Sequence, residues 1–103
     1  MTREEAIRLL QENMDTIRSF GVRRIGLFGS VVRGELSDAS DIDVVVEFEK
    51  GWANMRNVVG LVNFLEGLFG RKIDLMTAET IDYITNYHVR NSIKNEVNYV
   101  EAR

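Results

Sequence analysis

Apolar residues recur along the first part of the chain at the spacing of an amphipathic helix. They stand three or four residues apart, at Ile7, Leu10, Met14 and Ile17. This spacing places side chains on one helical face. Thr2 followed by Glu5 forms a capping-box pattern before this run, and Gly21 offers a stop after it. The pattern predicts one helix over residues 3–20.

Other runs alternate apolar and polar residues with the period of a β-strand. They predict strands over residues 23–28, 41–48 and 72–76 and a second helix over 55–69, with helical segments within 78–95 and an extended piece at 97–100. The alternation of helices and strands predicts a single α/β (α+β) domain over residues 1–103. We expect a small mixed sheet of three to four strands with helices packed on one face.

A tight turn and a brief helix are predicted between the first two strands. Gly29 and Ser30 follow the first strand directly, and the Ser30 hydroxyl is positioned to cap a helical turn over residues 31–33. Gly34 ends this turn, and residues 35–40 form a polar loop.

Acidic side chains fall on the face of the sheet opposite the apolar one. Ile42, Val44, Val46 and Phe48 share one face of their strand, so Asp41 and Asp43 point to the other. In the later strand, Ile73 and Leu75 alternate with Asp74 in the same way. If the two strands are neighbours, the three aspartates converge on the uncovered face of the sheet.

The charge and composition of the chain exclude several classes of function. A formal net charge of −3 and a pI near 5.1 argue against a domain that directly holds nucleic acid. The chain has no cysteine, and its apolar runs are much shorter than the roughly 20 residues that span a membrane. We therefore expect a cytoplasmic protein without disulfides and without membrane contact.

Carboxylates held this close together need positive charge between them. Oxygen ligands suit Mg²⁺ or Ca²⁺ better than a soft metal. Nucleotidyl transfer uses two Mg²⁺ ions, roughly 3.5 to 4 Å apart, to stabilise charge on the attacking and leaving oxygens. We expect Asp41 and Asp43 to bridge the ions and Asp74 to complete the one nearest the attacking hydroxyl. Gly29, Ser30 and Arg33 would bind the triphosphate.

The segment FGSVVRGELSDASDIDVVVEF resembles the signature of the DNA polymerase β-type nucleotidyltransferase superfamily. Its parts are Gly-Ser, ten residues, Asp-x-Asp and a third acid on a later strand, here in KIDLM. The whole chain resembles the minimal nucleotidyltransferase branch, which has little beyond the catalytic domain. One small departure is Val32, where such signatures often have Ala.

This resemblance implies a fold, an activity and a partner. It carries over Asp41, Asp43 and Asp74 as metal ligands, and Gly29, Ser30 and Arg33 as the nucleotide-binding turn. It implies an antitoxin that works in a complex with a HEPN-domain ribonuclease toxin. The implied reaction transfers AMP from ATP to a tyrosine hydroxyl of that toxin and neutralises it.

Other interpretations remain open at the level of sequence. The chain could modify a small molecule if a partner subunit supplied the acceptor pocket, or block a toxin by contact alone. An isolated Asp-x-Asp is common at solvated strand ends, and Arg33 could simply neutralise nearby acids. We expect His88 to be a structural or surface residue. Trp52 fits either the edge of the core or a partner contact.

Overall fold

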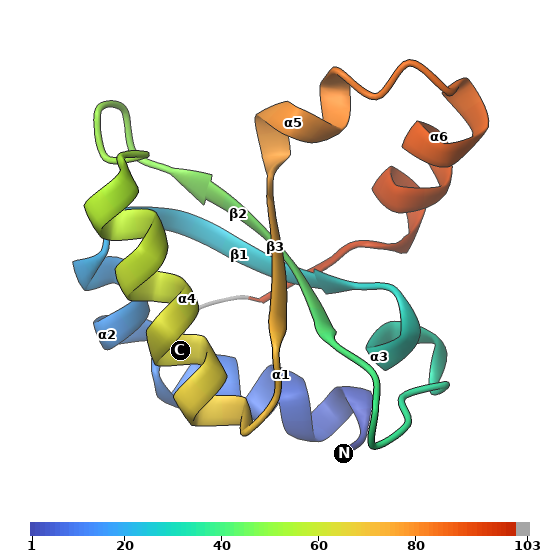
Figure 1. The fold of residues 1–103 in the computed structure, drawn as a ribbon, viewed down its shortest axis with the longest axis horizontal. Coiled ribbons are helices and arrows are strands. Elements are labelled where there is room, and N and C mark those ends of the chain that lie inside the picture. The colour runs from blue at the N-terminus through green and yellow to red at the C-terminus, as the bar shows by residue number, and fades with distance from the viewer. Residues whose placement is uncertain (101–103) are drawn as a thin grey trace.

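A four-stranded mixed sheet forms the centre of the computed structural model, which describes residues 1–100 (Figure 1). The strands are β1 (Val22–Phe28), β2 (Ile42–Phe48), β3 (Ile73–Thr77) and β4 (Asn98–Tyr99), in the order β3-β2-β1-β4. β1 runs antiparallel to β2 and β4, whereas β2 and β3 are parallel. The predicted mixed sheet is confirmed. The last three residues of the predicted domain lie outside the described residues.

The first helical segment is broken at Asn13, so the prediction of one helix over residues 3–20 was wrong. It forms α1 (Arg3–Glu12) and α2 (Met14–Ser19). The Asn13 side-chain amide donates a hydrogen bond of 2.8 Å to the backbone carbonyl of Leu9, and its φ of −113° is not helical. A short amide side chain that bonds nearby backbone in this way competes with the helix. The apolar face nevertheless continues across the break.

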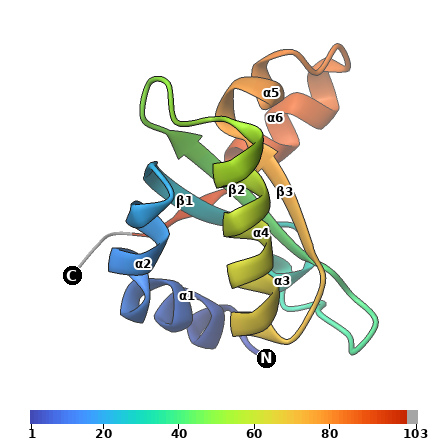
Figure 2. The same ribbon diagram turned by 60° about the vertical axis from the view of Figure 1, so that its left-hand side comes forward.

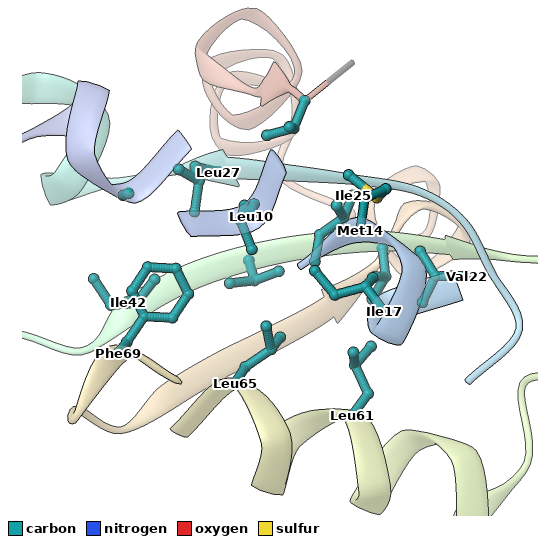
Figure 3. Packing of buried hydrophobic residues seen from close by; sticks show 14 of the residues in the cluster. Leu10, Met14, Ile17, Val22, Ile25, Leu27, Ile42, Leu61, Leu65 and Phe69 are labelled. Carbon is teal, nitrogen blue, oxygen red and sulfur yellow. The ribbon is translucent and has the colours of Figure 1, made fainter. Parts of the chain in front are cut away.

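The main core lies between one face of the sheet and the helices α1, α2 and α4 (Met55–Phe69) (Figures 2 and 3). Leu61 and Leu65 of α4 are fully buried against the sheet. Burying such a side chain contributes roughly 1.5 to 3 kcal/mol. Gly70 ends α4 in the left-handed conformation, directly after the predicted helix over residues 55–69.

The other face of the sheet is partly covered by α5 (Ala78–Asp82) and α6 (Tyr87–Glu96) (Figure 1). Phe28, Val45 and Ile81 form a second, smaller buried cluster there. The expectation of helices on one face holds for the main core but is incomplete, because Val45 gives the second face an apolar centre. Asp43 stands two residues before Val45 on the same face of β2, next to Phe28 of this cluster. Among the helices of residues 1–100, none is long and apolar enough to cross a membrane.

Candidate active site

Asp43 and Asp74 lie side by side on neighbouring parallel strands. The register of β2 and β3 pairs Asp43 with Asp74, and the alternation of both strands puts the two side chains on the face opposite the main core. Asp43 is half-buried and Asp74 is exposed. Burial, as the largest cause, and the negative charges of Asp74 and Asp41 together raise the pKa of Asp43 to about 6. The sheet therefore concentrates negative charge at this point.

Asp41 precedes β2 and is exposed to solvent. Its charge contributes to the raised pKa of Asp43. Within the described part of the chain, however, no three acidic, histidine or cysteine side chains are arranged closely enough to hold one metal ion. The three aspartate side chains would have to come closer together to hold one metal ion. Their oxygen-only donor set, with a half-buried carboxylate crowded by like charge, fits a hard cation such as Mg²⁺.

Gly29 forms the turn that brings β1 against the Asp43 carboxylate. Its φ is 76° and its ψ is −148°, a conformation essentially restricted to glycine. A Cβ atom at this position would lie 2.1 Å from Oδ2 of Asp43, far inside van der Waals contact. The turn therefore tolerates no side chain while Asp43 keeps this position.

The short helix α3 (Ser30–Arg33) follows this turn directly. The prediction that Ser30 caps it was wrong, because Gly29 occupies the N-cap position and Ser30 is the first helical residue. The cap is shifted by one residue because the left-handed Gly29 already turns the chain into the helix. Ser30 is half-buried and remains next to the turn that touches Asp43.

Arg33 ends α3 and is already paired with two acids. Its Nε donates a hydrogen bond of 3.0 Å to Oε2 of Glu35, and its Nη1 donates to Oε1 of Glu96. These two carboxylates, Glu35 first, raise the pKa of Arg33. The guanidinium also lies near enough to Asp43 to lower the pKa of that carboxyl slightly, against the larger effects that raise it. Sequence reasoning missed Glu96, since 63 positions separate it from Arg33.

Arg71 holds the loop that leads into Asp41. Its Nη1 donates to the backbone carbonyls of Ser37, at 2.6 Å, and Ser40, at 3.3 Å. Ser37 and Ser40 also bond each other through backbone and hydroxyl groups. Nothing in the local pattern singled out Arg71, because its partners are backbone carbonyls 31 and 34 residues away.

The two residues that the sequence left without a firm role, His88 and Trp52, lie on helix α6 and in the loop between β2 and α4. His88 is exposed on α6, and its ring meets the Tyr87 ring edge-on at 5.8 Å between centroids. Trp52 is 48% exposed and covers Gly21 at the start of β1. Trp52 thus packs at the edge of the core while keeping one side in solvent.

Two hollows lie away from the aspartates. One of about 720 Å³ adjoins Phe20 and Trp52. The other, of about 680 Å³, lies between the start of β1 and the α5–α6 pair. Opposite charges face each other in its walls, where Glu47 binds Arg23 and Arg24 and Asp82 binds Lys94. The aspartates, where like charges are brought close together, are the stronger candidate site.

A paired carboxylate site at the start of a parallel strand pair, beside a glycine turn and a short helix, is the arrangement of a nucleotidyltransferase. The sequence model of the family described as "Nucleotidyltransferase domain" matches residues 7–100. The chain belongs to this family.

Similarity to individual proteins extends over nearly the whole chain. It is 35% identical over 101 residues to "Protein adenylyltransferase MntA" of Thermococcus cleftensis, covering 97% of both chains. A solved "putative minimal nucleotidyltransferase" superposes with a TM-score of 0.72 at 29% identity, over 95% of both chains. A tri-AMPylated Shewanella oneidensis HEPN toxin in complex with an MNT antitoxin contains the same fold, with a TM-score of 0.59 at 15% identity. That match covers 94% of this chain and 73% of the other.

Proposed function

We propose that this chain transfers AMP from ATP to a tyrosine hydroxyl of a HEPN-domain toxin and thereby acts as its antitoxin. The observation that carries the proposal is the Asp43–Asp74 pair. Two carboxylates lie in register on neighbouring strands, and one of them, Asp43, has its pKa raised to about 6 and lies against a turn that excludes any side chain. Keeping such a charged cluster has an electrostatic cost, which a purely structural surface would have no reason to bear.

The reaction requires one bond to form and one to break at the α-phosphorus. The phenolic oxygen attacks this phosphorus, the bond to the bridging oxygen breaks, and pyrophosphate leaves. Asp41, Asp43 and Asp74 would hold two Mg²⁺ ions, which when bound supply positive charge to the attacking and leaving oxygens. Asp74, which is exposed to solvent as Asp41 is, would accept the proton of the phenolic hydroxyl.

The triphosphate would lie along the turn between β1 and α3. The absence of a side chain at Gly29 permits close approach of its backbone, and the Ser30 hydroxyl stands next to it. Arg33 would add a cation that matches phosphate oxygens in its planar geometry. These groups would bind and orient the nucleotide while the aspartates hold the reacting centre.

The choice of a protein acceptor rests on the relatives. The Thermococcus cleftensis protein, similar over 97% of its length, is a protein adenylyltransferase. The Shewanella oneidensis complex joins an antitoxin of this fold to a modified HEPN toxin. A small molecule would require a pocket beside the aspartates, whereas a protein tyrosine can approach the exposed Asp74 from solvent.

The test is incubation of the chain with ATP, Mg²⁺ and a HEPN-domain protein encoded in the neighbouring reading frame. Intact mass spectrometry should show the partner gaining AMP, and peptide mapping should place it on tyrosine. Asp43→Asn and Asp74→Asn should abolish the gain, whereas Asp82→Asn, a change to an exposed acid on α5, should not. An unmodified partner whose ribonuclease is still inhibited would instead favour inhibition by contact alone.

A further inference from the structure

Arg33 is held between two acids that come from different elements. Glu35 lies in the loop just after α3, whereas Glu96 is the last residue of α6. The Arg33 side chain is 48% exposed, while that of Glu96 is only 20% exposed. The contact therefore joins the nucleotide turn to the far end of the chain at a partly shielded point.

The location of Glu96 is unfavourable for helix α6 itself. The C-terminus of a helix carries partial negative charge, so a carboxylate in its last turn is destabilising there. Arg33 offsets this cost by donating directly to the Glu96 carboxylate. The Arg33 charge therefore stabilises the Glu96 carboxylate more than it would stabilise an acid elsewhere on the surface.

Two carboxylates on one guanidinium leave a local excess of negative charge. These carboxylates accept from two of the five N–H donors of Arg33 and hold its planar guanidinium in place, and both of them repel a triphosphate. Triphosphate binding to Arg33 is therefore strongest when Arg33 gives up at least one of these carboxylate partners. Glu35 is two residues from Arg33 in the chain, whereas Glu96 is 63 residues away, so Glu96 is the partner that can separate from Arg33 more freely.

We infer that Glu96 is a positioning residue that competes with the triphosphate for Arg33 and so weakens nucleotide binding. This inference rests on the proposed function, because it takes Arg33 as a triphosphate ligand. It assigns to the end of α6 an effect on nucleotide affinity. The chain would hold ATP less tightly than its phosphate-binding turn allows.

The test measures dissociation constants for ATP with Mg²⁺ by titration calorimetry. Glu96→Gln should bind ATP about two- to fivefold more tightly than the unmodified chain, the range that an exposed ion pair is worth. Binding of AMP, which lacks the outer phosphates, should change little. In transfer assays with the partner, the same variant should lower KM for ATP.

A double-mutant cycle separates competition from a general change in charge. Arg33→Gln should weaken ATP binding, and Glu96→Gln should then give no further gain in the Arg33→Gln background. Asp82→Asn is the matched control, because it also removes one acid and breaks a different ion pair to α6, that with Lys94. It should leave ATP affinity unchanged.

Several results would overturn the inference. Unchanged or weaker ATP binding by a folded Glu96→Gln variant would show that Glu96 supports Arg33 or is irrelevant to it. A gain that persists without Arg33 would reduce the effect to bulk charge. Glu96→Ala, with folding checked by circular dichroism, provides a second variant. If ATP affinity rises as expected but no AMP transfer occurs with any partner, the proposed function fails while the competition stands.

Discussion

Gly29 and Asp43 are in direct contact across the site, with the Gly29 Cα placed so that a Cβ would lie 2.1 Å from Oδ2 of Asp43. Gly29 directly follows β1, and Phe28 of β1 pairs with Asp43 of the antiparallel strand β2. The turn and the carboxylate therefore determine each other's position. Gly29 is therefore needed to leave space for the Asp43 carboxylate, in addition to its proposed role in phosphate binding.

Replacing Gly29 by alanine should damage both stability and transfer. The new methyl group must push the Asp43 carboxylate away, and the backbone conformation is strained for any other residue. We expect a loss of about 1 to 3 kcal/mol in the free energy of unfolding and a fall in transfer rate of roughly 100-fold or more. Urea unfolding and the AMP-transfer assay measure the two effects.

Gly34→Ala is the matched control for this change. Gly34 also has a positive φ, 72°, but a Cβ there meets nothing within 4 Å. It should cost about 1 kcal/mol through backbone strain alone and leave transfer nearly intact. Equal losses of activity in the two variants would argue that strain, and not contact with Asp43, disables the site.

The stability of the metal-free chain should fall as pH rises through the range in which Asp43 ionises. Its pKa is raised from the ordinary 3.8 to about 6 in the folded chain. The folded state therefore binds more protons than the unfolded state between about pH 4 and 6, so stability is lost as pH rises through this window. Asp43→Asn should remove this pH-dependent loss. Near neutral pH it should raise the free energy of unfolding by about 1 to 2 kcal/mol, after discounting for the partial exposure of Asp43.

Urea unfolding in EDTA, repeated from about pH 4 to about pH 7, checks this prediction. Asp74→Asn should flatten the same slope in part, because it removes one of the charges that raise the pKa of Asp43. Identical slopes for the unmodified chain and Asp43→Asn would contradict it. Such a stabilising but inactivating substitution is what a charged functional cluster produces.

The shared face of the aspartates was predictable from the sequence, because alternation along a strand depends only on residue parity. Asp43 and Asp74 each stand between residues of the apolar face, and this pattern required no knowledge of the fold. Their direct pairing depends on the register of β2 and β3, which the alternation along each strand does not determine. The interrupted first helix was missed because a single Asn13 side-chain bond, and no change in periodicity, breaks it.

Contacts between distant segments account for the rest of what the sequence did not show. The Arg33–Glu96 pair and the hold of Arg71 on the loop before Asp41 join residues more than 30 positions apart. Neither contact involves a sequence motif. The partner of Arg33 is an acid at the end of α6, and the partners of Arg71 are backbone carbonyls. The position of α5 and α6 over Val45 likewise depends on where the chain returns after β3.

Mg²⁺ should stabilise the unmodified chain if the aspartates bind it. At a fivefold excess over its dissociation constant, a ligand of the folded state adds about 1 kcal/mol, or roughly 4 to 8 °C in Tm for a domain of this size. Asp43→Asn and Asp74→Asn should lose this gain, which differential scanning fluorimetry measures. NaCl at matched ionic strength controls for screening. A gain that both variants retain would place Mg²⁺ elsewhere on the chain.

Trp52 should report on its contact with Gly21. A Cβ at Gly21 would lie 2.4 Å from the Trp52 Cβ and 2.7 Å from its ring, so Gly21→Ala must displace the indole. Because the chain has one tryptophan, its emission should shift to the red as the ring enters water, with a loss of about 1 to 3 kcal/mol in stability. Gly70→Ala is the control, since Gly70 also has a positive φ but a Cβ there meets nothing within 4 Å. An unshifted emission maximum in Gly21→Ala would show that the position of the Trp52 ring does not depend on this contact. A role for its exposed side in contacting a partner would then be the better explanation.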